Sequence, residues 1–456
     1  MHTPAARRFS AALAIAVAVA LLLAPAIWNG WPIVFFDTGG YIKRAFDLTL
    51  EPGRSLFYGL FLAGSSLGWL SLWGPVLLQA ASTVWLVRLT LRACGVAHGA
   101  LATLAVTALL ALGTGIGWYA AQLMPDALVP LLVLCVWLLA FHRRTLSGLE
   151  TVGVAAVGLL ALLSHMSSMA LAGGLVICAG AAWLLAKRLS WLGRPAPLAP
   201  ALLLAGAVVG MPLATGLITG SYAFTPGGAS FIFGRLVQDG IAQRFLDETC
   251  PDPAYRLCDY KDRMPRTADD WIWHADSPFQ MMGGFEGAEA ELAAITAETL
   301  RRYPGMQATT ALRSTLAQFA TFKTGDGLDE WQEVTRWMIS GYLPHLNEGF
   351  TAARQQRQET TQGLFDALNA VHVPVGWLSL VLSLAALAWA VRERQGEIVM
   401  LIAFVWLALL GNAFICGVLS NPHDRYQSRM IWLATLVVAV AAMRWWEMRR
   451  RKSFSP

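Results

Sequence analysis

The sequence predicts an all-α polytopic membrane protein with about ten transmembrane helices, each long enough to cross a bilayer. Of its 456 residues, 56% are hydrophobic and only 14% are charged, whereas charged residues make up roughly 25% of an average soluble domain. The apolar residues form stretches of about 17 to 22, and a helix of this length spans a hydrocarbon layer about 30 Å thick. We predict spans at residues 11–28, 74–92, 99–117, 127–142, 151–165, 168–186, 198–218, 373–391, 397–418 and 428–446.

The distribution of basic residues predicts the orientation. Pairs such as Arg143 and Arg144 occupy alternate short loops, and a basic tail follows the last span. The positive-inside rule therefore places these loops and both termini in the cytoplasm, with the protein in the inner membrane of a bacterium. We interpret the first apolar run as an anchor and not as a cleaved signal peptide. The basic residues form no stripe interleaved with aromatic residues, which argues against a nucleic-acid partner.

The spans divide the chain into three predicted regions. Residues 1–218 form an N-terminal transmembrane module, whose first outer loop at 29–73 contains one or two helices in the membrane interface, or a re-entrant pair. Residues 219–372 are rich in charge and lack a spanning run, so we expect a mostly helical extracytoplasmic domain. Residues 373–456 form the C-terminal transmembrane helices and the basic cytoplasmic tail.

Two of the six cysteines differ from the others in their surroundings. Cys250 and Cys258 lie eight residues apart in the predicted outer domain, whereas the other four fall within or beside apolar spans. An extracytoplasmic compartment is oxidising, so we expect a local disulfide between these two.

Ionisable residues at the outer ends of spans are the best candidates for chemistry, because a charge close to hydrocarbon costs free energy. Asp37 follows the first span, between aromatic residues and a Gly39-Gly40 pair that would let the chain bend closely around a ligand. An interfacial helix cap is the structural alternative for Asp37. Asp126 opens the fourth span, where ordinary helix capping is also an alternative.

The third candidate segment, Asn421 to Tyr426, opens the last span. Its Arg425 offers a planar fork of donors that suits a phosphate, although a surface contact with Asp424 would also explain the pair. Because the topology places all three segments on one side of the membrane, helix packing would bring them around one cavity. Two acids and an arginine suit a reaction in which a lipid phosphate leaves and a hydroxyl or amine attacks.

These motifs resemble those of the C-type (GT-C) polytopic membrane glycosyltransferases. The first outer loop, with Asp37 followed by Arg54-Ser55-Leu56-Phe57-Tyr58, looks like the first outer loop of that superfamily. Pro125-Asp126, Ser164-His165-Met166-Ser167 and Asp424-Arg425-Tyr426 are similar to further features of it. The resemblance covers the membrane portion of the chain, around two thirds of it. It implies transfer of a sugar from a polyprenyl-phosphate donor to an extracytoplasmic glycan, lipid or protein acceptor, usually with inversion.

The resemblance also implies roles for individual residues. Asp37 would be the general base or the acid that positions the acceptor, and Arg425 with Tyr426 would hold the donor phosphate. Asp126 and His165 would bind the acceptor or a divalent cation, Mg²⁺ or Mn²⁺. Supporting roles fall to Tyr41, Arg54 and Asp424. The first loop carries Asp-Thr-Gly-Gly where a paired acid is more common, which leaves metal dependence open.

Three other classes of function fit parts of the sequence. A transporter or flippase would also have about ten spans, but such proteins place ionisable groups near the midplane and often contain inverted repeats. An O-antigen ligase or polymerase would hold a pyrophosphate with arginines of its large loop, here Arg235 and Arg244 on an expected helix from Ser230 to Asp247. A non-catalytic partner in assembly or polysaccharide export is the third alternative.

Overall fold

The computed structural model describes residues 4–453, except 50–52, 221, 223, 225–226, 252–254, 331–333 and 358–361. The described residues form helices joined by loops, with an isolated β-bridge between Ile33 and Gln122. The α-helices are α1 (Pro4–Asn29), α2 (Thr38–Asp47), α3 (Leu56–Ser65), α4 (Trp73–Ala93), α5 (Ala100–Gly113), α6 (Ile116–Ala120), α7 (Leu128–Phe141), α8 (Gly148–Ser164), α9 (Met166–Leu185), α10 (Leu198–Thr219), α11 (Gly228–Gln238), α12 (Ile241–Thr249), α13 (Ala268–Trp273), α14 (Pro278–Met281), α15 (Gly284–Gly287), α16 (Glu289–Arg302), α17 (Pro304–Ala320), α18 (Val334–Tyr342), α19 (Asn347–Ala352), α20 (Gln362–Arg392), α21 (Gly396–Leu419) and α22 (Asp424–Ser453).

The prediction of an all-α membrane protein is confirmed. Seven helices of the described chain are long and apolar enough to cross a membrane, namely those at Phe9–Asn29, Trp73–Ala93, Met166–Leu185, Leu198–Ile218, Gly363–Arg392, Gly396–Leu419 and Asp424–Arg451. The other three predicted spans also coincide with apolar helices, but these are shorter: Ala100–Gly113, Pro125–Phe141 and Gly148–Ser164. The figure of ten spans therefore stays a prediction.

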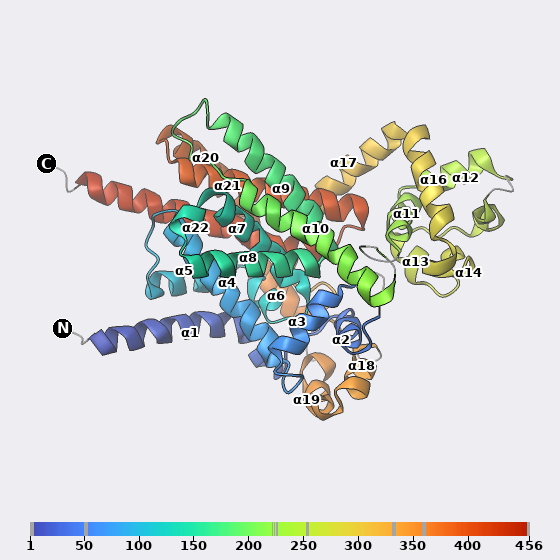
Figure 1. Ribbon diagram of the computed structural model, residues 1–456, viewed down its shortest axis with the longest axis horizontal. Coiled ribbons are helices and arrows are strands. Elements are labelled where there is room, and N and C mark those ends of the chain that lie inside the picture. The colour runs from blue at the N-terminus through green and yellow to red at the C-terminus, as the bar shows by residue number, and fades with distance from the viewer. Residues whose placement is uncertain are drawn as a thin grey trace.

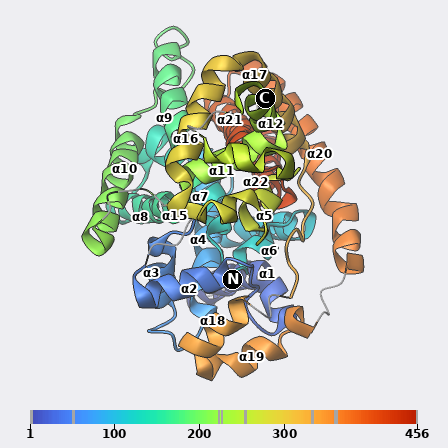
Figure 2. The same cartoon turned by 90° about the vertical axis from the view of Figure 1, so that its right-hand side faces the viewer.

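The long helices run side by side along the longest axis of the molecule (Figure 1). Both chain ends lie at one end of this bundle, and helices α11 to α16 lie at the other. Viewed from that second end, α2, α18 and α19 lie together below the bundle (Figure 2). The side of a membrane that each end faces stays a prediction.

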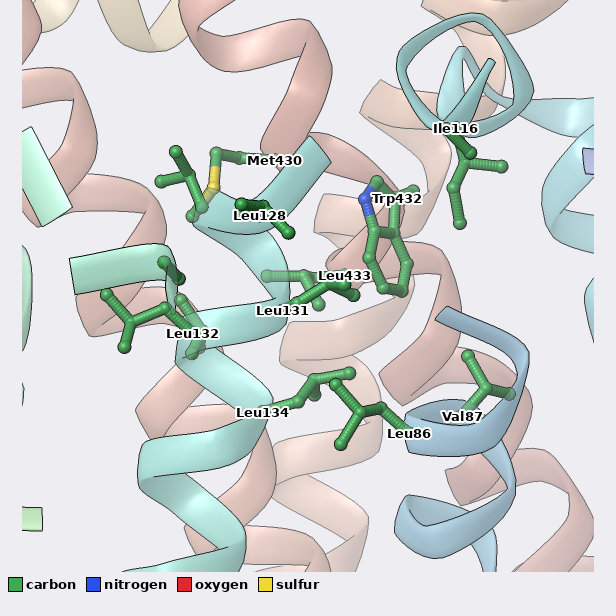
Figure 3. Close-up of a cluster of buried hydrophobic side chains, with 14 of the residues drawn as sticks. Leu86, Val87, Ile116, Leu128, Leu131, Leu132, Leu134, Met430, Trp432 and Leu433 are labelled. Atoms are coloured by element: carbon green, nitrogen blue, oxygen red, sulfur yellow. The ribbon is translucent and has the colours of Figure 1, made fainter. Parts of the chain in front are cut away.

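Helix α7 occupies the centre of the bundle. Every residue from Leu128 to Ala140 is buried, as expected for a helix that is apolar on all its faces. It packs against α4, α8, α9, α10, α21 and α22. Figure 3 shows Leu131 of α7 beside Leu433 of α22, and Leu134 near Leu86 of α4. This packing fixes the N-terminal end of α7, with Asp126 just before it, against the first turns of α22.

Helices α11 to α16, here called the α11–α16 group, have a hydrophobic core of their own around Phe233, Phe245, Trp271 and Phe279. The expected helix from Ser230 to Asp247 is instead two helices, α11 and α12, because Gly240 between them has a left-handed backbone with φ of 71°. Cys250 and Cys258 are joined by a disulfide bond beside this core.

The remainder of the 219–372 segment packs on the bundle. Helix α17 lies against α21, and α18 lies against α2. The side chains of Ile339, Leu343 and Phe350, in and after α18, belong to the core of the bundle. This segment thus contributes the α11–α16 group and also several helices that cover the bundle; the predicted domain boundaries stay a prediction.

The loop at 29–73 contains two helices, α2 and α3, which approach each other closely. The ring of Tyr41 on α2 packs edge to face against Tyr58 on α3, with the ring centroids 4.9 Å apart. A Cβ at Gly59 of α3 would lie 2.5 Å from the carbonyl oxygen of Tyr41. The absence of a side chain at Gly59 therefore allows α3 to hold α2 in place.

We expect Gly59→Ala to destabilise the protein by about 1–3 kcal/mol, because the added methyl would displace the backbone of α2. The matched control is Gly64→Ala in the same helix, where a Cβ would meet nothing within 4 Å. That change should be neutral or stabilising by up to about 1 kcal/mol, since alanine favours helix over glycine. Thermal unfolding of the two purified variants in detergent measures the difference, and equal stabilities would contradict the packing described.

Candidate functional site

A cavity of about 550 Å³ lies where the bundle meets the α11–α16 group, since both contribute to its lining. The loop before α2, the start of α7 and the start of α22 supply its bundle side, and α11 and α13 supply the other. Seven of the residues predicted from the sequence line this one cavity: Asp37, Tyr41, Arg54, Asp126, His165, Arg425 and Tyr426. The expectation that segments from the beginning, middle and end of the chain meet at one hollow therefore agrees with the structure.

Asp37 occupies the N-cap position of α2, but its side chain makes no capping hydrogen bond. Instead Arg54 donates two hydrogen bonds, from Nε at 3.2 Å and from Nη2 at 2.7 Å, to the same oxygen, Oδ1. The second oxygen, Oδ2, accepts no hydrogen bond from the described residues. Asp37 thus has one oxygen that orients it and one that is available to a ligand in the cavity.

The two glycines after Asp37 do not bend the chain around a ligand, and that part of the sequence interpretation is wrong. Both lie within α2, where they permit close packing. A Cβ at Gly40 would lie 2.4 Å from Cδ of Arg54, and one at Gly39 would lie 3.1 Å from the Cα of Thr335 on α18. Gly40 therefore allows the Arg54 side chain to pack against α2 and reach Asp37. Gly39 allows α18 to pack closely against the same helix.

Tyr41 lies one turn after Asp37 on α2, with its side chain buried beside the cavity. Burial, and to a smaller extent the charge of Asp37, raise the pKa of the Tyr41 hydroxyl. Tyr41 therefore stays neutral at any ordinary pH, as a polar group that carries no charge.

Asp126 forms a buried ion pair with Arg429 of α22. Nη1 of Arg429 donates to Oδ1 of Asp126 at 2.8 Å, and the two side chains are 0% and 3% exposed. The same Nη1 lies 3.1 Å from Nε2 of His165, whose Nδ1 lies 2.8 Å from the hydroxyl of Ser167. Since a guanidinium can only donate, His165 accepts at Nε2, which assigns its proton to Nδ1. Asp126 thus has a specific cationic partner, which ordinary capping would not require.

Arg425 lies one helical turn before Arg429 on α22. Its guanidinium lies 4.3 Å from the ring centroid of Phe35 and 4.8 Å from that of Tyr426, and Nη2 donates to the Tyr426 hydroxyl at 3.2 Å. Within the described part of the chain it forms no ion pair with a carboxylate. Two aromatic rings therefore hold a cation whose charge remains available on the wall of the cavity.

Asp424 plays a different part from its neighbour. Its carboxylate accepts a hydrogen bond from the backbone N–H of Lys323, and it is not among the residues that line the cavity. Asp424 therefore connects the start of α22 to the loop after α17 through this hydrogen bond.

Among the lining and supporting residues that escaped the sequence interpretation are Arg429 and Asp326. Arg429 could have been identified, because it follows Arg425 by four residues within an apolar span, where an unpaired charge is costly. Asp326 lines the cavity from the loop after α17, and its Oδ2 accepts a hydrogen bond from the backbone N–H of Arg425 at 3.0 Å. Its only sequence signal is its position between two glycines.

The arginines of the alternative ligase hypothesis lie elsewhere. Arg235 pairs with Asp239, the residue just after its own helix, and donates to the hydroxyl of Ser314 at 2.6 Å. Arg244 is exposed and pairs with Glu248 at 2.9 Å. Neither lines the cavity.

The cavity is lined by both acidic and basic side chains, among them Asp37, Asp126 and Arg425. Arg425 can hold an anion, and the free oxygen of Asp37 can accept a proton. No group of three or more His, Cys, Asp or Glu residues in the described ranges could hold a metal ion. Mg²⁺ often relies on one or two carboxylates with substrate phosphates and water, so the metal prediction stays a prediction. Comparisons of the chain with models of known protein families, with curated proteins and with solved structures find no match.

Proposed function

We propose that the protein is a membrane glycosyltransferase that moves a sugar from a polyprenyl-phosphate donor to an acceptor outside the cytoplasm. The observation that carries this proposal is the shared cavity of Asp37 and Arg425. Among the described residues, Asp37 has an oxygen that accepts no hydrogen bond and Arg425 pairs with no carboxylate. A carboxylate and a guanidinium of this kind are the two groups that such a transfer needs.

The reaction follows from the charges that develop during it. An acceptor hydroxyl attacks the anomeric carbon while the bond from that carbon to the phosphate oxygen breaks, through an oxocarbenium-like state. Asp37 takes the acceptor proton on Oδ2, and polyprenyl phosphate leaves with the electron pair of the broken bond. Arg425 stabilises the negative charge that grows on that phosphate. Attack from the face opposite the leaving phosphate inverts the anomeric configuration.

The buried residues behind the cavity position the two reacting groups. Asp126 and His165 fix Arg429, and Arg429 shares the first turns of α22 with Arg425. Arg54 orients Asp37 through Oδ1. Asp126 and Arg54 are thus positioning residues in this proposal, because their own charges are satisfied by protein partners.

We expect Arg425→Gln to raise the KM for the donor by about 10- to 100-fold, the usual effect of losing a hydrogen bond to a charged group. The assay uses the full chain in liposomes, with radiolabelled polyprenyl-phosphate glucose, mannose, galactose and N-acetylglucosamine as donors and cell-envelope lipids and glycans as acceptors. The matched control is Arg244→Gln, an exposed arginine outside the cavity. Failure of the wild-type protein to consume any of these donors would overturn the proposed function, as would an unchanged KM in Arg425→Gln.

A further inference from the structure

The side of the cavity formed by the α11–α16 group carries an exposed tryptophan. Trp273, the last residue of α13, lines the cavity and is 51% exposed. Its ring lies 6.2 Å from that of Phe231 and 6.2 Å from that of Phe285, measured between centroids. The two phenylalanines therefore support the indole while half of the residue remains exposed. A large apolar surface of this kind inside a cavity indicates a binding role.

A carboxylate lies beside this aromatic surface. Asp269 precedes Trp273 by four residues on α13, so both side chains lie on the same face of the helix. Its Oδ2 accepts a hydrogen bond from Nδ2 of Asn421 at 3.3 Å and lies 3.8 Å from Nε2 of His423. Its Oδ1 accepts no hydrogen bond from the described residues. The wall thus combines an aromatic plane with an acceptor for hydroxyl groups.

We infer that Trp273 and Asp269 form a saccharide subsite, which binds a pyranose ring of the acceptor. That the bound sugar belongs to the acceptor rests on the proposed function. A pyranose presents a face of C–H bonds, whose positive edges suit the negative face of an indole. It also carries a rim of hydroxyls, which donate to a carboxylate such as Asp269. Trp273 can therefore bind the C–H face of the pyranose, and Asp269 can accept hydrogen bonds from its hydroxyls.

The position of α13 favours a sugar over the polyprenyl chain of the donor. Helix α13 belongs to the α11–α16 group, which extends beyond the end of the long apolar helices (Figure 1). An apolar chain at Trp273 would lie outside the hydrocarbon and beside the charged side chain of Asp269 in the same cavity, which costs free energy. Asn421 and His423, the polar groups beside Asp269, precede Arg425 in the chain and line the same cavity. A sugar bound at Trp273 would therefore lie in the same cavity as the donor phosphate.

Binding of the full chain in nanodiscs to an immobilised array of oligosaccharides of glucose, galactose, mannose, rhamnose and N-acetylglucosamine tests the subsite. We expect the wild-type protein to bind at least one of them. Trp273→Ala should weaken that binding about tenfold or more, the size of effect that the loss of aromatic stacking produces. Trp273→Phe keeps an aromatic face and should retain most of the binding. The matched control, Trp337→Ala, removes a tryptophan of α18 that is 74% exposed and lies outside the cavity.

In the array experiment, two results would overturn the subsite: no oligosaccharide bound by the wild-type protein, or equal binding by Trp273→Ala. The elution profile of each variant in size-exclusion chromatography shows whether it remains folded, and Asp269→Asn provides a second variant that leaves the aromatic cluster intact. Asp37→Asn separates this inference from the proposed function: it should lower transfer by about 10²- to 10⁴-fold, whereas binding to the array should still weaken when Trp273→Ala is added to Asp37→Asn. Transfer activity with an unchanged KM for the acceptor in Trp273→Ala would refute the subsite alone.

Discussion

Replacing Asp37 with Asn should lower the kcat for sugar transfer by about 10²- to 10⁴-fold, the usual contribution of a general base. An amide has nearly the shape of a carboxylate, and its oxygen can still accept the hydrogen bonds that Arg54 donates. The substitution therefore removes the ability to take a proton and leaves the position of the side chain almost unchanged. Initial rates at saturating donor, measured in the liposome assay, give the effect on kcat.

Asp47→Asn is the matched control for this variant. Asp47 is the last residue of α2, where it accepts a hydrogen bond from the Tyr342 hydroxyl at 2.7 Å, and it does not line the cavity. We expect its kcat to stay within about threefold of the wild type, because Asp47 lies outside the cavity. The variant should also remain folded, since surface changes alter the free energy of unfolding by only about 0.5 kcal/mol. If Asp37→Asn retained full activity, the assignment of the base would be wrong.

Arg429→Met should destabilise the folded protein by about 3–5 kcal/mol, the usual result of removing one partner from a buried ion pair. The change leaves the carboxylate of Asp126 without its cationic partner in a setting where only 3% of that side chain is exposed. The temperature at which half of the detergent-solubilised protein leaves its unaggregated peak in size-exclusion chromatography measures the loss. That temperature should fall clearly below the value for the wild type.

A double variant separates loss of the pair from loss of packing. Asp126→Leu combined with Arg429→Met replaces both charges with apolar groups, so it should be more stable than Arg429→Met alone. Arg444→Met is the matched control on the same helix, because Arg444 is partly exposed and bonds to Gln395 and to a backbone carbonyl. A double variant that was no more stable than the single one would show that the ion pair is not the dominant interaction.

The positions of the bundle helices could be predicted because each is a continuous apolar run. The number of spans could not, and α7 shows why. An uninterrupted run from Leu128 to Ala140 is compatible with contact with lipid on all sides, but in the structure it is surrounded by other helices. Composition reports that a helix avoids water, and does not distinguish lipid from protein as its surroundings.

The convergence of Asp37, Asp126 and Arg425 could be predicted from topology, whereas their individual partners could not. Arg54 reaches Asp37 only because Gly40 has no side chain, a fact of packing between two segments that lie seventeen residues apart. The partner of Asp126 is three hundred and three residues away, on the last helix. Pairings of this kind depend on how helices dock, for which a single sequence carries no direct signal.

The two groups of the proposed reaction, Asp37 and Arg425, come from distant parts of the chain, and this has a consequence for biosynthesis. A ribosome that adds about 5–20 residues per second needs on the order of 20 to 80 s to travel from Asp37 to Arg425. Until the final helix is made, the nascent polypeptide has Asp37 without the arginine that holds the donor phosphate in the proposed reaction. A truncated translation product would therefore be inert, and no fragment that ends before α22 should consume lipid-linked sugar.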